Sequence, residues 1–299
     1  MKALLVTRPM PALPFIDAIR SRAPAIELLE YRSPLTDAEL ADVDTVLGWQ
    51  MPQGLPSRLP RLRWVCSVAA GVEKLLAPDL APAVRVSRIV DREQAAGMAQ
   101  FVVAMALRHA RDLDRYDAQQ RERVWLRQPT PMARHRVAVL GTGATGGEIA
   151  AWLERCGLVV RGWNRRSPEG LHALLAASEL VVCALPLTSE TEGILDAAAF
   201  AAMPRGAYVI NVARGAHVVE ADLIAAVRSG HLRGAALDVQ RREPLPADDP
   251  LWTVSGIVIT PHIAAQPSTE TIADQFVASA HALERGEPLP NEIDRARGY

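Results

Sequence analysis

Short runs of apolar residues alternate along the chain with segments whose apolar positions recur at helical spacing. In the second half this alternation is regular, which predicts successive βα units around a parallel sheet. The expected strands are 136–140, 158–163, 180–184, 207–212, 234–239 and 256–260. The expected helices are 145–155, 171–177, 195–202 and 220–229. Right-handed crossovers between them would make this part of the chain a doubly wound sheet.

The chain before residue 95 shows the same alternation on a smaller scale. Its expected strands are 2–6, 26–30, 45–47, 62–68 and 84–90, with helices at 13–20 and 36–40. The stretch 95–116 has no Gly or Pro after Gly97 and predicts one uninterrupted connecting helix. We therefore expect an α/β protein of two Rossmann-like or flavodoxin-like domains with parallel sheets and a cleft between them.

A glycine-rich turn stands between the strand expected at 136–140 and the helix that follows it. Gly141, Gly143 and Gly146 have G-x-G-x-x-G spacing, which in this strand–turn–helix context predicts a dinucleotide-binding site. Gly141 would make the tight turn, Gly143 would let a pyrophosphate approach the backbone, and Gly146 would let helix and strand pack closely. The N–H groups at the start of the helix, including those of Ala144 and Thr145, would hold the phosphates. The spacing alone is weak, because tight turns and methyltransferase loops also use it.

This motif assigns roles to the two expected domains. The dinucleotide-binding Rossmann domain would span 96–269, and a last helix is expected at 269–285. If that helix returns to the first domain, the substrate-binding domain is discontinuous and consists of 1–95 and 270–299. Ligands of such sheets bind at the carboxyl ends of the strands, so the residues there are the candidates for contact. Five of them complete the expected cofactor site: Leu185, Pro186, Val212, Ala213 and Asp238.

The end of the second strand predicts which nicotinamide is used. An enzyme that binds NAD usually has Asp or Glu at this position to hold the ribose 2′-hydroxyl, whereas this chain has Asn164, Arg165 and Arg166. Two guanidinium groups can neutralise a 2′-phosphate, with the amide hydrogen-bonding beside them. We therefore expect NADPH to be preferred, with NADH possible. The alternative interpretation is a pair of solvated arginines on a turn.

Composition limits the other classes of function. The chain has 299 residues, 49% of them hydrophobic, and a formal net charge of −1, which argues against nucleic-acid or membrane-surface binding. Cys66, Cys156 and Cys183 lie in apolar stretches, so we expect buried thiols in a reducing compartment, and their spacing suits no metal site. The start lacks a signal-peptide pattern, and no apolar run reaches transmembrane length. We expect a soluble, cytoplasmic protein.

Four stretches resemble the D-isomer-specific 2-hydroxyacid dehydrogenases: 139–146, 210–215, 236–246 and 260–264. The C-terminal stretch 286–299 is similar to that of the glyoxylate/hydroxypyruvate reductase A subgroup. The resemblance implies a homodimer and a catalytic trio of Arg214, Glu243 and His262. Arg214 would bind the carboxylate and carbonyl oxygen of a 2-oxo acid. His262 would donate a proton to the developing alkoxide, and Glu243 would favour its imidazolium form. No metal is expected, because Arg214 and His262 already supply the electrophilic help.

The resemblance also implies substrate-binding groups in the first domain. The backbone N–H groups of Ala70 and Gly71 would bind the substrate carboxylate, together with Arg214 and His262. Trp49 stands where the subgroup places an aromatic ring against the substrate, although ordinary core packing explains it equally well.

These observations predict NADPH-dependent reduction of a small 2-oxo acid, such as glyoxylate or hydroxypyruvate, to the 2-hydroxy acid. The alternative is a regulatory protein that binds a nicotinamide and has kept the fold without turnover. The segment 167–170 is short compared with the family, so the cofactor sheet is expected to lack an edge strand.

Overall fold

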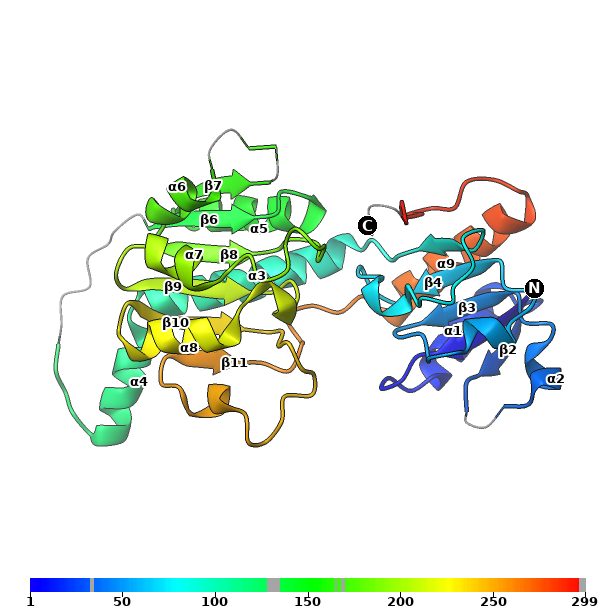
Figure 1. Ribbon diagram of the computed structural model, residues 1–299, viewed down its shortest axis with the longest axis horizontal. Coiled ribbons are helices and arrows are strands. Elements are labelled where there is room, and N and C mark those ends of the chain that lie inside the picture. The colour runs from blue at the N-terminus through cyan, green and yellow to red at the C-terminus, as the bar shows by residue number, and fades with distance from the viewer. Residues whose placement is uncertain (33–34, 128–134, 165, 168–169, 296–299) are drawn as a thin grey trace. The chain divides into compact units, whose positions relative to one another are not determined.

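The computed structural model describes residues 1–32, 35–127, 135–164, 166–167 and 170–295 (Figure 1). The chain forms two compact units, and the second interrupts the first along the sequence. The first unit consists of Met1–Arg92 and Gln266–Tyr299, and the second of Glu93–Ala265. Each unit is built around its own parallel sheet, and the alternation of apolar runs and helical spacing accounts for both sheets.

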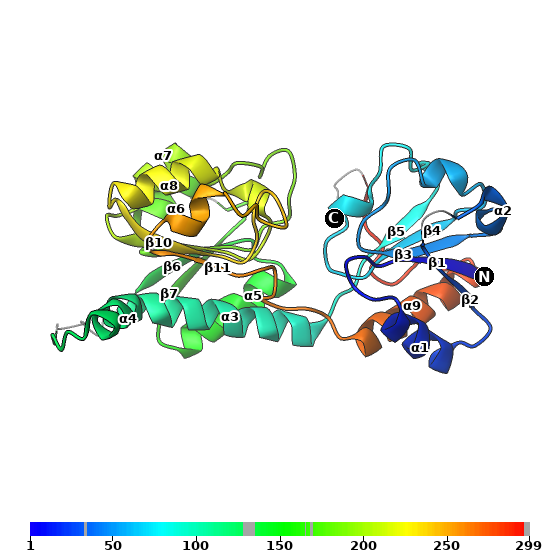
Figure 2. The same cartoon turned by 90° about the horizontal axis from the view of Figure 1, so that it is seen from below.

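The first unit has a five-stranded sheet in the order β2-β1-β3-β4-β5, with every pair of neighbours parallel. The strands are β1 (Lys2–Val6), β2 (Glu27–Glu30), β3 (Thr45–Gly48), β4 (Trp64–Ser67) and β5 (Arg85–Ser87). Helices α1 (Leu13–Arg22) and α9 (Thr269–Glu284) cover one face (Figure 2). The other face carries α2 (Asp37–Leu40) and the short 3-10 helices Pro56–Arg58 and Glu73–Leu75. Strands β1, β3 and β4 are short and almost wholly buried, so they read as apolar runs, whereas β2 at the edge is partly exposed.

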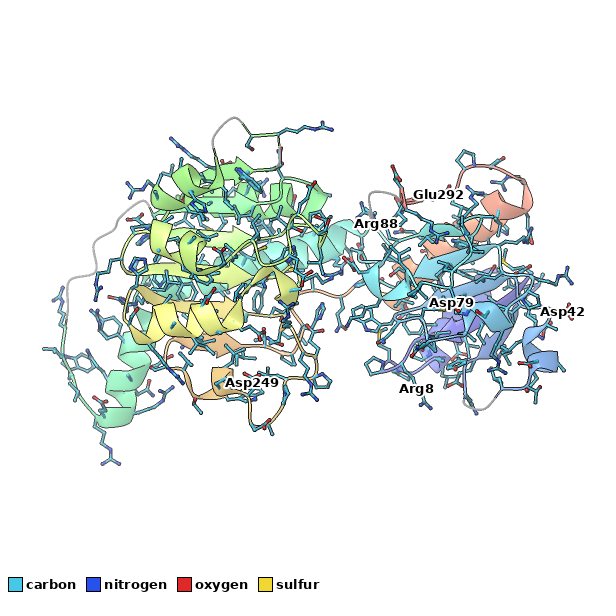
Figure 3. The ribbon with its side chains drawn as sticks, viewed as in Figure 1. Arg8, Asp42, Asp79, Arg88, Asp249 and Glu292 are labelled. Carbon is cyan, nitrogen blue, oxygen red and sulfur yellow. The ribbon has the colours of Figure 1, made fainter. Side chains whose placement is uncertain are left out.

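Helix α9 belongs to the core of this unit, although it is distant from it in sequence. The ring of Phe276 stacks on that of Trp64 in β4 with their centroids 5.0 Å apart. The segment after α9 is attached at the edge of the sheet. There Arg85 of β5 and Glu292, which is labelled in Figure 3, form an ion pair with 2.6 Å between Nη2 and Oε2. Hydrogen bonds from Arg85 lower the pKa of the Glu292 carboxyl.

The second unit has a six-stranded parallel sheet in the order β11-β10-β9-β8-β6-β7. The strands are β6 (Arg136–Leu140), β7 (Val159–Trp163), β8 (Leu180–Cys183), β9 (Ala207–Asn211), β10 (Leu232–Leu237) and β11 (Ile257–Ile259). Helices α3 (Arg92–Ala110) and α5 (Ala144–Arg155) cover one face. The opposite face is covered by α6 (Leu171–Ala176), α7 (Ala197–Ala202) and α8 (Glu220–Arg228), as Figure 2 shows. This is the expected doubly wound sheet.

The strand order determines where a ligand binds on this sheet. The chain leaves β6 toward β7 on one side and then returns to β8 on the other, so the order reverses between β6 and β8. Open α/β sheets bind ligands outside the carboxyl ends of the strands at such a point. No strand lies beyond β7 in the part of the chain that the structure describes, as the short segment after Arg166 predicts.

The expected single connecting helix over 95–116 is wrong. Helix α3 ends at Ala110, and α4 (Leu113–Glu122) begins after Asp112, whose backbone is left-handed with φ 56°. Asp tolerates this conformation better than most residues do. Arg108 of α3 also pairs with Asp114 of α4, with 2.6 Å between Nε and Oδ1. The ion pair between Arg108 and Asp114 therefore connects the two helices across this break.

The expectation of three buried thiols is also wrong at one position. Cys66 and Cys183 are buried, and burial raises the pKa of each thiol to about 12. Cys156 is exposed, because it caps α5 at the turn that leads into β7. Within the described residues no helix is long and apolar enough to cross a membrane. The same residues contain no group of three or more His, Cys, Asp or Glu side chains placed to hold a metal ion.

Candidate active site

The turn from β6 to α5 has the geometry that a phosphate site requires. Gly141 has φ 100°, and a Cβ there would lie 2.5 Å from the Ala184 carbonyl oxygen. A Cβ on Gly146 would lie 1.7 Å from the Gly141 carbonyl oxygen, so the close contact between helix and turn depends on glycine. Gly143 is the N-cap of α5 and has open space where a side chain would stand. The N–H groups of the first turn of a helix have no intrahelical partner, so Ala144 and Thr145 can present theirs to an anion.

The end of β7 is tied to this turn. The amide Nδ2 of Asn164 donates to Thr142 Oγ1 at 2.9 Å, and Asn164 Oδ1 accepts the N–H of Arg166 at 2.8 Å. Arg166 is exposed, and no carboxylate occupies the sequence positions directly after β7. Arg165, the other predicted phosphate-binding arginine, lies outside the described residues. A dinucleotide fits this edge of the sheet. Gly143 leaves the backbone open, the first turn of α5 presents N–H groups, and Arg166 places a positive charge after β7.

Arg214 follows β9 and is partly buried. Its Nη1 donates to the Ala213 carbonyl at 2.7 Å, and its own carbonyl accepts from Asn211 Nδ2 at 2.9 Å. A Cβ on Gly215 would lie 1.9 Å from the carbonyl carbon of Gln240, so glycine lets this loop pack against the loop after β10. The two loops that carry Arg214 and Glu243 are thereby in direct contact.

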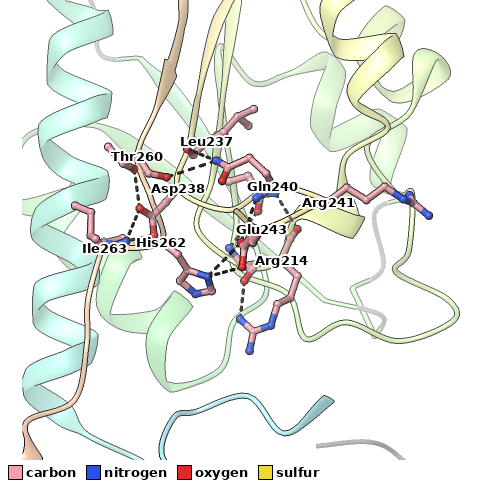
Figure 4. A network of polar contacts seen from close by, with 12 residues as sticks. Arg214, Leu237, Asp238, Gln240, Arg241, Glu243, Thr260, His262 and Ile263 are labelled. Carbon is pink, nitrogen blue, oxygen red and sulfur yellow. Dashed lines mark hydrogen bonds and ion pairs between the residues drawn. The ribbon is translucent and has the colours of Figure 1, made fainter. Parts of the chain in front are cut away.

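The carboxylate of Glu243 lies within hydrogen-bond distance of the imidazole of His262, which is the pairing that the family resemblance implies. The distances from His262 Nδ1 to the two carboxylate oxygens of Glu243 are 3.1 and 3.2 Å (Figure 4). The side chain of Glu243 is 23% exposed, and that of His262 is 29% exposed. Glu243 Oε1 also accepts the backbone N–H of Gln240 at 3.3 Å. The Nδ1 atom of His262 faces the carboxylate, and Nε2 lies on the other side of the ring. In Figure 4 the side chains of His262 and Arg214 extend to the same side of the network.

The remaining predicted cofactor residues lie at the carboxyl ends of β8, β9 and β10. Leu185, Val212 and Ala213 are buried, and Pro186 is exposed. Asp238, directly after β10, is 1% exposed and accepts hydrogen bonds from residues around His262. Its neighbour Gln240 is also buried and donates to the Leu237 carbonyl at 3.0 Å.

Sequence reasoning missed one residue that holds this edge together. His217 is completely buried, and its Nδ1 lies 3.2 Å from the Arg214 backbone nitrogen. Its Nε2 lies 3.3 Å from the carbonyl oxygen of Pro186, another predicted cofactor residue. The imidazole thus links the loop after β8 to the loop after β9. Its position three residues after Arg214 was the only signal, and sequence alone did not indicate the link.

The substrate candidates of the first unit also follow strands of a parallel sheet. Ala70 is exposed, Gly71 is partly exposed, and both belong to the turn after β4. Buried Ser67 shapes this turn, since its hydroxyl donates to the Gly71 carbonyl at 2.7 Å and accepts the Ala69 N–H at 3.0 Å. Trp49, after β3, is partly buried, and the Lys74 ammonium lies 5.2 Å from its ring centroid.

A family model described as D-isomer specific 2-hydroxyacid dehydrogenase, NAD binding domain, matches residues 103–264. This stretch is more than half of the chain and contains the glycine turn, Arg214, Glu243 and His262. The chain belongs to the D-isomer specific 2-hydroxyacid dehydrogenase family. The predicted resemblance and enzyme class are confirmed.

Relatives of this dehydrogenase match over nearly their whole length. Glyoxylate/hydroxypyruvate reductase A of Yersinia enterocolitica is 34% identical, with 95% of this chain and 96% of the relative covered. A D-isomer specific 2-hydroxyacid dehydrogenase from Xanthobacter autotrophicus Py2, solved with NADPH and MES, is 38% identical with a TM-score of 0.90. The alignment covers 100% of this chain and 99% of that one.

A third relative comes from Sinorhizobium meliloti. This NADPH-dependent glyoxylate/hydroxypyruvate reductase, solved with NADP and sulfate, is 30% identical with a TM-score of 0.91. The alignment covers 100% of this chain and 99% of that one. Together these similarities support the predicted subgroup and the predicted fold of two α/β domains.

Proposed function

We propose that this dehydrogenase uses NADPH to reduce a small 2-oxo acid, such as glyoxylate or hydroxypyruvate, to the 2-hydroxy acid. The observation that carries the proposal is the contact between His262 Nδ1 and the Glu243 carboxylate, which lies beside the loop of Arg214. Reduction of a carbonyl needs a proton donor, and stabilisation of the charge that develops on the oxygen. These three side chains supply both.

Each side chain has one task in the proposed reaction. The guanidinium of Arg214 binds the substrate carboxylate and polarises the carbonyl oxygen. His262 holds a proton at Nε2 and transfers it to that oxygen, and Glu243 stabilises the imidazolium and orients the ring. Bound NADPH supplies the hydride. In the reverse direction His262 accepts the proton.

The first unit is proposed to be the substrate-binding domain, with boundaries near 1–95 and 270–299. The N–H groups of Ala70 and Gly71 then bind the carboxylate, and Trp49 contacts the rest of a small substrate. The second unit, near 96–269, is proposed to be the dinucleotide-binding domain. Family membership further supports a homodimer.

The first test follows nicotinamide absorbance with NADPH and NADH in parallel. The substrates are glyoxylate, hydroxypyruvate, pyruvate and phenylpyruvate. We expect rapid NADPH oxidation with the first two and a loss of about 10²- to 10⁴-fold in kcat for His262→Ala, because general acid catalysis contributes this much. His172→Ala, an exposed histidine of α6, is the matched control and should retain full activity. NADPH binding without turnover of any 2-oxo acid would instead favour the regulatory alternative.

The second test concerns the 2′-phosphate. The absence of an acidic residue after β7 and the NADP-bound relatives support the preference for NADPH. Replacing both Arg165 and Arg166 with Ala should weaken NADPH binding about 10- to 100-fold, as expected for lost charge-assisted hydrogen bonds, and leave NADH binding unchanged. Arg228→Ala, at an exposed arginine of α8, is the control. Equal losses for both nucleotides would contradict recognition of the 2′-phosphate.

A further inference from the structure

The backbone of Arg214 is held on both sides by one histidine. The N–H of Arg214 donates to His217 Nδ1 at 3.2 Å, and the carbonyl of Arg214 accepts the His217 N–H, also at 3.2 Å. The same carbonyl accepts from Asn211 Nδ2 at 2.9 Å. Both backbone polar groups of Arg214 are therefore bound within the loop after β9. The direction in which the guanidinium leaves this loop depends on these contacts.

The contacts of the His217 ring fit one form of the imidazole. The Arg214 carbonyl, which lies 3.0 Å from Nδ1, already accepts two hydrogen bonds, and a carbonyl oxygen has two lone pairs. Nδ1 is then the acceptor for the Arg214 N–H, and the ring proton lies at Nε2, 3.3 Å from the Pro186 carbonyl. A neutral imidazole has one acceptor and one donor nitrogen, so it can bind both loops at once.

The loop of Pro186, which follows β8, is the second loop that the ring contacts. This loop is expected to contact the cofactor, and the Pro186 carbonyl also accepts the Thr191 hydroxyl at 2.8 Å. A backbone hydrogen bond from the Gly193 N–H to the Ala216 carbonyl, at 2.8 Å, continues the connection. His217 is 0% exposed, so the partners of its ring replace water. A buried polar side chain thus lies between the loop of the proposed cofactor contacts and the loop of Arg214.

We propose that His217 is a positioning residue for Arg214, and that its neutral imidazole holds the Arg214 backbone so that the guanidinium faces the 2-oxo acid. The inference rests on the proposed role of Arg214 in binding that substrate. The contact at Nδ1 holds Arg214, and the contact at Nε2 fixes the ring against the loop of Pro186. The two nitrogens therefore differ in their importance for the substrate, whereas a side chain that only fills a buried space has no such asymmetry.

Two substitutions separate the ring nitrogens. The amide of Asn reaches about as far from the backbone as Nδ1, and that of Gln about as far as Nε2. His217→Asn can thus still accept the Arg214 N–H, and His217→Gln can still donate to the Pro186 carbonyl. We expect kcat/KM for glyoxylate to fall roughly 10²-fold in His217→Gln, because a misplacement of about 1 Å has effects of this size. His217→Asn should stay within about fivefold of the wild type, the cost of one lost hydrogen bond.

NADPH binding and a matched histidine complete the comparison. His217→Gln should bind NADPH within about threefold of the wild type, because the Gln amide and Thr191 both hold the Pro186 carbonyl. His231 is the control, since its Nε2 also lies near a backbone carbonyl, that of Phe200 at 2.9 Å, but directly before β10. His231→Gln should retain the wild-type kcat/KM and the wild-type Kd for NADPH.

A double-mutant cycle separates positioning from a general structural role. Within Arg214→Ala, His217→Gln should change the residual kcat/KM by less than about twofold, since the side chain that it positions is gone. The same fold loss in both backgrounds would overturn the inference. So would a larger loss in His217→Asn than in His217→Gln, which is the order expected if the ring only fills space. A wild-type kcat/KM in Arg214→Ala overturns the proposed function itself, and this inference with it.

Thermal unfolding of each variant shows whether it is folded. If His217→Gln is not, His217→Asn decides alone, because it keeps the contact with Arg214 and loses the one with Pro186. A loss in kcat/KM of more than about tenfold there exceeds the cost of one hydrogen bond and overturns the inference, and a value near that of the wild type supports it.

Discussion

His109, at the end of α3, is a buried histidine that takes no part in the proposed chemistry. Its ring stacks on Tyr208 of β9 with centroids 4.6 Å apart, and it is 9% exposed. Burial, together with the nearby charges of Arg233 and His135, lowers its pKa from 6.5 to about 4. The folded protein therefore keeps this ring neutral at pH values where the unfolded chain protonates it.

The sign of the pH effect follows from this difference. Between pH 6.5 and about 4 the unfolded state binds more protons at His109, so the free energy of unfolding falls as the pH falls. The loss amounts to on the order of 3 kcal/mol when complete. In His109→Phe, which retains the stacking, the free energy of unfolding measured with urea should decline less steeply over this pH range. The exposed His172→Phe should follow the wild type, and an unchanged slope in His109→Phe would contradict the assignment.

At the residue scale, the sequence predicts contacts that depend on strand ends. Glu243 and His262 follow β10 and β11, which are adjacent in the sheet, and the family resemblance implies that the two side chains pair. The three hydrogen bonds of Asp238 and the link through His217 cannot be predicted in this way. They depend on which way a buried side chain turns, and no spacing in the sequence encodes that choice.

At the scale of elements, the turn from β6 to α5 offers a position where a substitution should weaken cofactor binding and leave the fold intact. A Cβ on Gly143 or Gly147 meets nothing within 4 Å in the protein. Gly143 lies at the N-cap, where the pyrophosphate is expected to approach, and Gly147 lies farther into the helix. A methyl group at 143 should therefore obstruct the phosphates without disturbing the fold.

Calorimetric titration with NADPH tests this expectation. Gly143→Ala should weaken binding by at least about tenfold, while its melting temperature stays close to that of the wild type. Gly147→Ala is the matched control and should retain both properties. Equal affinity in the two variants would show that the phosphates bind elsewhere.

The helices and strands are predicted well where the spacing of apolar residues alone determines them. The expected strands 2–6 and 136–140 coincide with β1 and β6, and the other strands differ from expectation by one to three residues at their ends. The connecting helix was wrong because its periodicity continues through Asp112. There, a left-handed backbone and the pairing of Arg108 with Asp114 create the break. Such a break depends on contacts between side chains, which helical spacing does not show.

At the scale of the whole molecule, one described stretch exposes an unusual amount of apolar surface. Leu113 is 45% exposed, Val124 46%, Trp125 100% and Leu126 54%. Val124, Trp125 and Leu126 follow one another along the chain, and contiguous exposed apolar groups mark an interaction surface. A homodimer is proposed for this dehydrogenase, so a second copy of the chain is the partner expected to cover these apolar side chains.

Light scattering coupled to size-exclusion chromatography tests this prediction. The wild type should elute as a dimer at micromolar concentration, and Trp125→Ser combined with Leu126→Ser should shift it toward the monomer. Trp252→Ser removes another exposed tryptophan, 53% exposed and in a different loop, and should leave the dimer intact. A monomeric wild type would refute the dimer, and an unaffected double variant would place its interface elsewhere.

The interruption of the first unit affects the order in which a ribosome can complete the protein. Residues 1–92 emerge first, but the helix that covers α1 and Trp64 begins only at Thr269. The second unit is contiguous and can fold during synthesis, while the first waits with an apolar face open to water. A nascent chain that stops before α9 therefore carries a complete nucleotide-binding unit joined to an unfinished one. The domain made first is the last to be finished.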